Sequence, residues 1–506
     1  MSEAREISVG RRGFIERHGL WDAEQQAAAA AVLARMADEG IKTVRLAFPD
    51  QHGIVRGKWL TSEAFATSMR NGMDFAVSHY CWDTGQEIVF NPFSAGGGFG
   101  RSDMSGFPNA LLVPDPLSFR PVPWAQHAGW IVADMYFHTG EPVPFAPRHV
   151  LRGALDELAR RGLGCVAGLE VEWYLTKLVD PMLEPDHLGA PGWPATAPRV
   201  QAAGHGYQYQ MDSHLDELEP LLSVLTDHLR AAGLPLRSIE DEWGPGQLEF
   251  TFSPLEGMAA ADAMMFFRVA VKQICRRLGY LATFMCQPAI PHFYSSGWHL
   301  HQSLTEGTTN AFIPASDEHA LSEIGMQYMG GLLNHAAAAS VFTTPTINGY
   351  RRVKPFSLAP DRATWGVNNR GAMLKVEGGV RGDPSAHIEN RIGEPAATPY
   401  LYLASQIVAG LDGIDSNADP GAPSETPYEE TSRPLLPTSL ADAVAALEAD
   451  PIFMEKFGQE FVDLIVTLKK SEIKRYQAHL EAEKLTPEDA ANTVTEWEQH
   501  EYFEVF

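Results

Sequence analysis

Cysteine is scarce in this chain: it has four cysteines among 506 residues, and none of them forms a Cys-x-x-Cys pair. So few cysteines exclude a disulfide framework, and a reducing compartment, the cytoplasm, is expected. The amino-terminal segment lacks the apolar core of a signal peptide. The most apolar long stretch, 330–345, contains Asn334 and His335 and is too short to cross a bilayer, so no membrane segment is predicted.

Basic residues are also few relative to acidic ones. Lys and Arg total 39 against 64 Asp and Glu, which gives a net charge of −25. Electrostatic binding to a nucleic-acid backbone or an anionic membrane is therefore not expected, and an anionic substrate will need local Arg, Lys or metal. The apolar share of 45% and the charged share of 20% are globular values, which exclude a disordered chain, a collagen and a coiled-coil rod.

The pattern along the chain predicts a small and a large domain. Residues 22–38 predict a helix that Gly40 ends, and 41–60 predict two strands around a turn, followed by a loop-rich stretch. From Pro147 onward, amphipathic helices alternate with apolar strands. The further candidate helices are 213–232, 257–279, 321–341, 398–413, 438–449 and 452–484. We expect a mixed domain at 1–142 and a larger one at 143–506.

Several apolar strands carry polar residues at alternate positions, which lie on one face of a strand. The pairs are Glu170 with Glu172, His299 with His301, and Glu389 with Arg391. A Gly-Pro-Gly turn between Glu242 and Glu249 can fold these two carboxylates toward each other. One such pair is usually a solvated surface, but four such segments with strongly apolar neighbours predict an antiparallel sheet with one polar face.

Five glutamates on one polar face repel one another and need cations to persist. Carboxylate oxygens together with one imidazole suit Mg²⁺ or Mn²⁺ better than a thiolate-loving metal, and the pattern leaves the choice between these two ions open. The sequence therefore predicts a divalent-metal site.

Eight segments, in order, resemble the glutamine synthetase family from about Lys42 to the carboxyl end. They are VRLAFPDQHGIVRGKWL, GLEVEWYL, GPGQLEF, ATFMCQP, SGWHLHQSL, PTINGYRRV with APDRATWGVNNR, HIENRIGEPAATPYLYLA and AGLDGI. The resemblance implies an α+β fold, with a small β-grasp N-terminal domain and a large catalytic α/β domain that has a curved antiparallel sheet. It also implies hexameric rings, often stacked into dodecamers, with active sites between the catalytic domain of one subunit and the small domain of the next.

The resemblance further implies ATP as a substrate, two to three Mg²⁺ or Mn²⁺ ions, and a set of site residues. The first ion would be held by Glu172, Glu242 and Glu249, and the second by Glu170, His299 and Glu389. Arg352 matches the arginine that pairs with the α-carboxylate of glutamate. Arg370 and Arg391 match arginines around the transferred phosphoryl group and the γ-carboxylate. His301 and Ser303 match positions that line the nucleotide phosphates.

Some positions depart from the family pattern. Ser295-Ser296 replaces the glycine-rich step ahead of the first histidine, near the amino end of glutamate, which leaves the acyl substrate open. His387 and Lys375 stand where the family has arginines that contact phosphate and nucleotide. Lys375 keeps the charge, so altered affinity is expected rather than lost activity.

The most telling departure is Leu358. Glutamine synthetases carry a flap glutamate six residues after the glutamate-binding arginine, where it closes the site, helps bind ammonium and accepts a proton. The prolines of the run Arg352–Pro360 place Leu358 at this position. The residue indicates an amine other than ammonium, and the alternative is a leucine that only packs the flap.

Two features of the small domain bear on the amine. Asp74, in GMDFAVS, weakly matches the acidic residue that a neighbouring subunit offers to ammonium, and a loop cap or a solvated carboxylate is the alternative. The run His79–Trp82 is either a wall of an enlarged amine pocket or packing within the small domain.

The resemblance and its departures together predict a γ-glutamylamide ligase. ATP would activate the γ-carboxylate of L-glutamate as γ-glutamyl phosphate, and a neutral aromatic amine such as aniline would attack it, as a first step in amine degradation. The alternatives are a ligase for alkylamines or polyamines, and a glutamine synthetase that uses ammonium. A non-catalytic relative is a third possibility, which the presence of all six metal-ligand positions disfavours.

Overall fold

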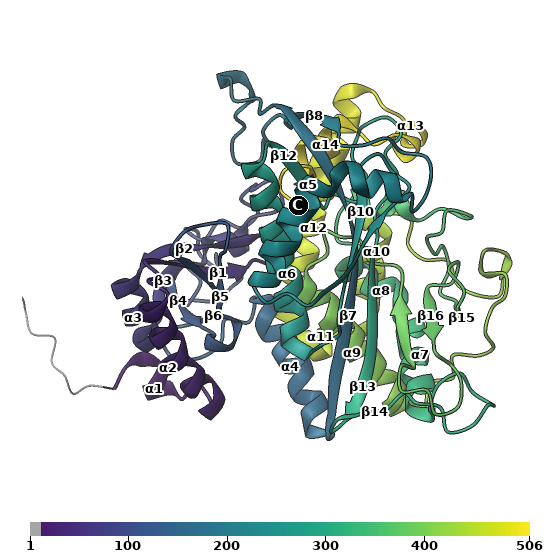
Figure 1. Cartoon of the computed structure of the whole chain (residues 1–506), viewed down its shortest axis with the longest axis horizontal. Coiled ribbons are helices and arrows are strands. Elements are labelled where there is room, and N and C mark those ends of the chain that lie inside the picture. Colours follow the sequence, from purple (N-terminus) through teal and green to yellow (C-terminus); the bar gives the residue numbers. More distant parts are fainter. Residues whose placement is uncertain (1–11) are drawn as a thin grey trace, which may run out of the picture.

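Two sheets organise the chain, whose computed structural model describes residues 12–506 (Figure 1). The first sheet has the order β2-β1-β6-β4-β3, with β5 beside β6, and three helices pack around it. Its strands are β1 (Thr43–Pro49), β2 (Val55–Thr61), β3 (Met73–Ala76), β4 (Asn109–Pro114), β5 (Arg120–Pro121) and β6 (Ala128–Tyr136). Its helices are α1 (Phe14–His18), α2 (Ala23–Asp38) and α3 (Ser62–Asn71). The central pair, β1 and β6, is parallel.

The second sheet is larger and carries the polar strands. Its main order is β15-β16-β17-β13-β7-β10-β9, and β15 runs parallel to β16 while the other neighbours on this path are antiparallel. Its main strands are β7 (Leu163–Asp180), β9 (Leu236–Asp241), β10 (Gln247–Phe252), β13 (Trp298–Glu306), β15 (Trp365–Val367), β16 (Leu374–Glu377) and β17 (His387–Asn390). Four short strands pair at its margins, namely β8 (Arg199–Ala202), β11 (Leu255–Glu256), β12 (Tyr280–Thr283) and β14 (Thr309–Asn310).

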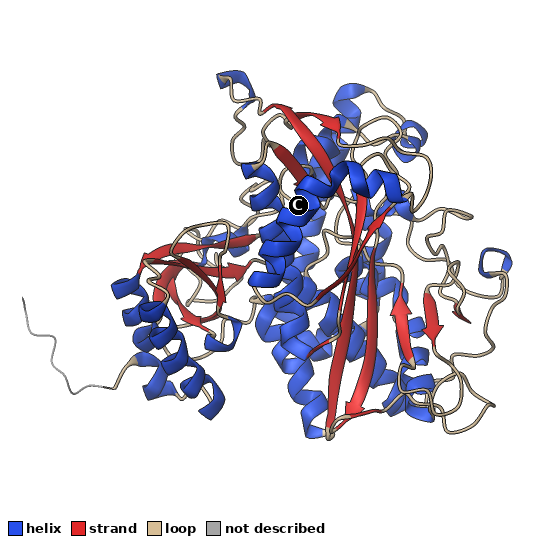
Figure 2. Cartoon of the chain, in the orientation of Figure 1, coloured by secondary structure: helices blue, strands red, loops and turns tan. Residues whose placement is uncertain are grey.

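Helices pack against this sheet and against one another: α4 and α6 lie on β7, and α5 lies on β9. The helices that follow the first sheet in the chain are α4 (Pro147–Arg160), α5 (Asp212–Ala231), α6 (Gly257–Arg277), α7 (Glu323–Asn334), α8 (Ala336–Thr343), α9 (Pro399–Ser416), α10 (Leu440–Ala449), α11 (Pro451–Phe457), α12 (Gln459–Glu483), α13 (Pro487–Asn492) and α14 (Glu496–Tyr502). Figure 2 shows α4, α6 and α9 beside the long, twisted strands β7 and β13. None of these described helices has the length and apolarity needed to cross a bilayer.

The predicted polar face follows from the alternation along β7. Leu169, Val171 and Trp173 are buried in the core, whereas Glu170 and Glu172, which alternate with them, are partly exposed on the opposite face. The antiparallel register places Glu170 opposite His299 and Glu172 opposite Glu249. The same ladder places His301 opposite Glu389, and Glu389 opposite Lys375. The pattern of alternate residues thus fixes which side chains meet.

Most predicted helices are confirmed, but two are interrupted. The predicted helix 22–38 is α2, capped by Asp22 and Gln25 in a reciprocal pair. The predicted helix 321–341 is divided at His335, whose ring contacts Asp412 and Asp450. The predicted helix 452–484 is divided at Gly458, which has a φ of 94° that only glycine adopts readily.

The small sheet depends on distant segments for its packing. Leu464 and Leu468 of α12 are buried in the hydrophobic cluster of the first sheet. Arg475 of α12 binds Asp83 at 2.9 Å, and Thr84 donates to Glu501 of α14 at 2.5 Å. The two sheets lie on either side of the predicted boundary between 142 and 143, and the boundary itself stays a prediction.

Arg148, on α4, joins the first sheet to α6. Its buried guanidinium lies 2.7 Å from Asp115 and 2.8 Å from both Asp134 and Asp262. Arg148→Met should lower the free energy of unfolding by about 3–5 kcal/mol, because three buried carboxylates lose this partner. Denaturant unfolding measures the loss. Arg152→Met is the control, since Arg152 is half-exposed and binds Asp134 alone; an equal loss for both variants would contradict the prediction.

Candidate active site

A cavity of about 760 Å³ opens on the polar face of the large sheet. Three kinds of side chain form its walls. The acids include Glu170, Glu172, Glu240, Glu242, Glu249 and Glu377; the basic groups include His299, Arg352, Lys354, Arg370, Lys375 and Arg391; and the large apolar or aromatic groups are Tyr209, Trp243, Tyr294, Phe356 and Leu358. Most of the predicted site residues therefore share one cavity.

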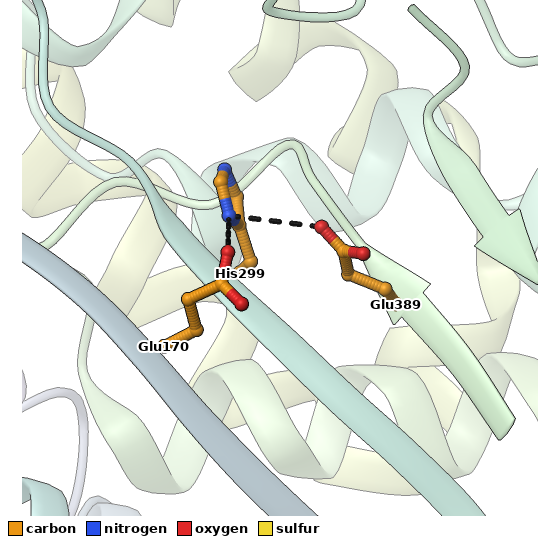
Figure 3. A group of neighbouring side chains, drawn as sticks. All are labelled: Glu170, His299 and Glu389. Atoms are coloured by element: carbon orange, nitrogen blue, oxygen red, sulfur yellow. Dashed lines mark hydrogen bonds and ion pairs between the residues drawn. The ribbon is translucent and has the colours of Figure 1, made fainter. Parts of the chain in front are cut away.

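Two overlapping groups of side chains can hold metal ions, and His299 belongs to both. One group is Glu170, His299 and Glu389, and Figure 3 shows the three side chains converging from β7, β13 and β17. His299 Nδ1 lies 2.5 Å from Glu170 Oε1 and 3.7 Å from Glu389 Oε1. The other group is Glu172, Glu249 and His299. Within each group the possible ligand atoms lie within 4.8 Å of one another.

Glu242 lies on the cavity wall but outside these two groups. It follows β9, and its Oε2 accepts a hydrogen bond of 3.3 Å from the Trp243 amide. Of the three residues predicted to hold the first ion, Glu172 and Glu249 therefore lie close together, and Glu242 lies farther from them. Glu242 still acts electrostatically, because its charge contributes to the raised pKa of Glu249.

Two carboxylates of this cavity, Glu242 and Glu249, lie close to other carboxylates. Burial and the charge of Glu172 raise the pKa of Glu242 to about 8. Burial and the charges of Glu170 and Glu172 raise the pKa of Glu249 to about 11. Burial and Arg391 lower the pKa of His299, so its imidazole is neutral, as a metal ligand must be. These oxygen donors with one neutral imidazole fit Mg²⁺ or Mn²⁺.

Glu389 differs from Glu242 and Glu249, because cations surround it. Lys375 Nζ lies 2.8 Å from Glu389 Oε2, and Arg391 binds Oε1. Burial opposes the charge, but His299 and Arg391 outweigh burial and lower the pKa of Glu389 to about 2. Lys375, predicted as a nucleotide contact, also binds Glu377. Its ammonium is therefore held within the charge network of the sheet.

The predicted phosphate-side residues lie along β13 and β17. Burial opposes ionisation of Glu170, but hydrogen bonds from His299 and His301 hold its pKa well below the usual range. His301 Nε2 lies 3.1 Å from Glu170 Oε2, and its Nδ1 lies 2.9 Å from His387 Nε2. The histidine that replaces a family arginine thus contacts His301. Ser303 follows on the same face of β13, opposite Val166.

The three predicted arginines converge on the cavity. The buried Arg352 donates to the Arg391 carbonyl at 2.7 Å and lies 3.2 Å from His299 Nε2. Gly297 makes this approach possible, because a Cβ there would lie 2.4 Å from the Arg352 guanidinium. Arg391 Nε donates to the carbonyl of Arg370 at 3.2 Å, and the Arg370 side chain is exposed on the wall.

The flap, residues 353–360, forms an apolar part of the wall. Leu358 is 53% exposed and lines the cavity, as does Phe356. Tyr428 holds this segment: its hydroxyl donates to the Ala359 carbonyl at 2.9 Å, and its ring lies 5.0 Å from that of Phe356. Tyr428, from the loop that follows α9, thus contacts the flap through both its hydroxyl and its ring.

Asp74 is not brought to the cavity of its own chain. It lies on β3 of the first sheet, exposed, 3.4 Å from His138. A role across a subunit boundary stays a prediction. His79 and Tyr80 are buried, and the His79 ring packs against Phe48 at 5.0 Å. The structure therefore favours packing within the small domain for the run His79–Trp82.

Sequence reasoning missed Gln247 and a pair of aromatic residues. Gln247 Nε2 donates to Glu172 Oε2 at 3.0 Å and to Ser296 Oγ at 2.9 Å, which orients a possible metal ligand. Gln247 could have been found from the sequence, because it lies two residues before Glu249 in β10 and therefore on the same face of the strand. Tyr209 and Trp243 line the cavity as a stacked pair, and no local pattern connects them.

Comparison with known proteins agrees with this geometry. The sequence pattern of the glutamine synthetase catalytic domain matches residues 144–486, and the chain belongs to the glutamine synthetase family. Among its relatives, a γ-glutamylanilide synthase of Acinetobacter sp. is 46% identical over 97% of this chain and 98% of its own length. A glutamate–isopropylamine ligase of Pseudomonas sp. is 30% identical over 86% of this chain and 92% of its own length.

A solved structure supports the same assignment. The structure of GmaS in complex with ADP superposes with a TM-score of 0.73 at 27% identity, over 92% of this chain and 98% of that one. The predicted family, fold class and enzyme class, an ATP-dependent carboxylate–amine ligase, are confirmed. Membership also implies the use of ATP and divalent metal.

Proposed function

We propose that this protein joins the γ-carboxylate of L-glutamate to a neutral aromatic amine such as aniline, with ATP converted to ADP and phosphate. The observation that carries the proposal is the apolar flap, where Leu358 stands on the wall of the cavity that holds the carboxylate groups. The similarity to a γ-glutamylanilide synthase supports it.

The proposed reaction has two steps. A γ-carboxylate oxygen attacks the γ-phosphorus of ATP, the bond to the ADP oxygen breaks, and γ-glutamyl phosphate forms. The amine nitrogen then attacks the acyl carbon, the carbon–oxygen bond to phosphate breaks, and the nitrogen loses a proton. In this proposal Arg370 and Arg391 neutralise the transferred phosphoryl oxygens, and Arg352 holds the α-carboxylate. All three line the cavity.

The metal ligands in this proposal are the six predicted residues. They are Glu170, Glu172, Glu242, Glu249, His299 and Glu389. Two to three Mg²⁺ or Mn²⁺ ions bound there would supply positive charge to the phosphate oxygens. His301, Ser303 and Lys375 would serve the nucleotide. Hexameric rings, stacked into dodecamers, would bring Asp74 of one subunit to the site of the next, and a cytoplasmic location remains a prediction.

ADP release in the presence of glutamate and a panel of amines tests the proposal. Aniline should give a higher rate than methylamine or ammonium at one fixed pH. Release that depends on ammonium alone would indicate a glutamine synthetase. Failure of every amine in the panel to support ADP release would indicate a non-catalytic relative.

A ligase for alkylamines is the second candidate, because of the similarity to a glutamate–isopropylamine ligase. Isopropylamine is a cation at neutral pH and would gain from a carboxylate that binds it and removes its proton. The leucine at 358 does not supply this group. A preference for isopropylamine over aniline in the same panel would favour this candidate.

Arg352→Lys should raise the KM for glutamate much more than the KM for ATP. Lysine keeps the charge but loses the planar fork that matches a carboxylate. It also loses the bond to the Arg391 carbonyl that holds the guanidinium in place. Steady-state kinetics with each substrate varied in turn measures the effect. A rise confined to the KM for ATP would show that the residue has been assigned to the wrong substrate.

A further inference from the structure

We infer that the stacked side chains of Tyr209 and Trp243, which line the same cavity as the apolar flap, bind the aromatic ring of the amine. This inference rests on the proposed function and adds the residues that select an aromatic amine. The pair lines the same cavity as the carboxylates and arginines. Neither residue is among those that the proposed function assigns to the metal ions, the phosphates or glutamate.

The two rings are held in place and remain accessible. Their centroids lie 5.3 Å apart at an interplanar angle of 11°, and the residues are 45% and 47% exposed. The loop that carries Tyr209 is tied to β9, because the Gln210 amide donates to the Asp241 carbonyl at 3.1 Å and Gln210 Nε2 donates to Glu240 at 2.9 Å. The stack is thus a fixed aromatic surface on the cavity wall.

The flap contributes a second apolar surface to the same cavity. Phe356 is 75% exposed, although it packs on one side against Tyr428. Phe356 and Leu358 have φ values of 58° and 63°, a left-handed conformation that such residues rarely adopt. The flap is therefore held in a specific form, with its apolar side chains exposed on the wall.

The chemistry of these surfaces suits a neutral aromatic ring. Aromatic rings prefer offset or edge-to-face contact with one another, which adds to the gain from burying apolar area. A neutral ring needs no charged partner on this part of the wall. Trp243 directly follows Glu242, so the stack adjoins the acidic part of the cavity where the acyl group would be activated.

The adenine of ATP is the other ring that could use the stack. The strand order argues against it. Tyr209 and Trp243 adjoin β9, at one edge of the sheet path. The predicted nucleotide contacts His301 and Ser303 lie on β13, in the middle of this path, and Lys375 lies on β16, beyond it. Arg370, which lines the same cavity as the stack, is assigned to the transferred phosphoryl group rather than to adenine. The amine is therefore the ring assigned to the stack.

Steady-state kinetics of Trp243→Leu and Tyr209→Leu tests the inference. Each variant should raise the KM for aniline about tenfold, the effect of losing one ring contact and its buried area. The KM values for ATP, glutamate and ammonium should stay within about twofold of wild type. Trp243→Phe keeps a ring and should retain most of the affinity for aniline. Trp193→Leu is the matched control, because Trp193 is 77% exposed and lies outside the cavity wall.

The outcomes separate this inference from the proposed function. If wild type does not use aromatic amines, the proposed function fails and the inference fails with it. If wild type uses aniline and both leucine variants keep its KM, the inference alone is overturned. A rise in the KM for ATP without a rise for aniline would assign the stack to adenine and overturn the inference as well.

Discussion

Glu249→Ala and His299→Ala should each lower turnover about 100- to 1,000-fold while the protein stays folded. His299 belongs to both candidate metal groups, and Glu249 belongs to one of them together with Glu172. Loss of either ligand would weaken the positive charge that phosphoryl transfer requires. Single-turnover ADP release with glutamate and aniline measures the effect. Glu256→Ala is the control, since Glu256 is exposed at the end of β11, outside the cavity wall.

Thermal unfolding gives a second measurement for Glu249. Burial and the charges of Glu170 and Glu172 raise its pKa to about 11, against an ordinary value of 4.5. As the pH rises above 4.5, the unfolded chain loses this proton while the metal-free fold keeps it, so the residue costs stability at neutral pH. Glu249→Ala should therefore unfold at an equal or higher temperature in a chelator and gain less from added Mg²⁺ than wild type. Wild-type turnover or a full metal-dependent shift would refute the ligand assignment.

Leu358→Glu should shift the preferred amine from aniline toward ammonium and small alkylamines. These amines are cations at neutral pH and gain from a carboxylate that binds the charge and accepts the proton. A neutral arylamine offers the carboxylate no charge to pair with, so a glutamate on the wall would be desolvated without a partner. Competition between aniline and ammonium at fixed pH, with both amide products quantified, measures the change.

Leu183→Glu is the matched control for this change, because Leu183 is an exposed leucine away from the cavity wall. It should leave the ratio of the two products at the wild-type value. An equal loss for every amine in Leu358→Glu would show that residue 358 only packs the flap. A wild-type preference for ammonium or a polyamine would remove the basis of the prediction.

The polar face of the large sheet could be predicted because it follows from local alternation. Once Glu170 and Glu172 share a face of β7, an antiparallel neighbour with His299 and His301 must place its side chains beside them. The division into a polar and an apolar face needs no knowledge of distant contacts. The family resemblance then supplied the roles of the residues on these strands.

Other parts of the site depend on contacts that no local pattern records. Tyr209 and Trp243 meet because two loops are tied together across β9, and their spacing in sequence carries no period. The binding of Lys375 to Glu389 follows from the pairing of β16 with β17, which sequence analysis did not predict. The interruption at His335 reflects its contacts with Asp412 of α9 and with Asp450, which lies between α10 and α11.

The packing of Leu464 and Leu468 in the core of the first sheet has a consequence for protein synthesis. The strands of that sheet leave the ribosome long before α12 is made. Part of the apolar surface of the small domain therefore stays exposed to solvent until Leu464 and Leu468 have been synthesised and can pack against it. The ion pair between Arg475 and Asp83 forms later still. A chain that stalls before α12 would therefore expose this surface to chaperones, and synthesis of α12 would end that exposure.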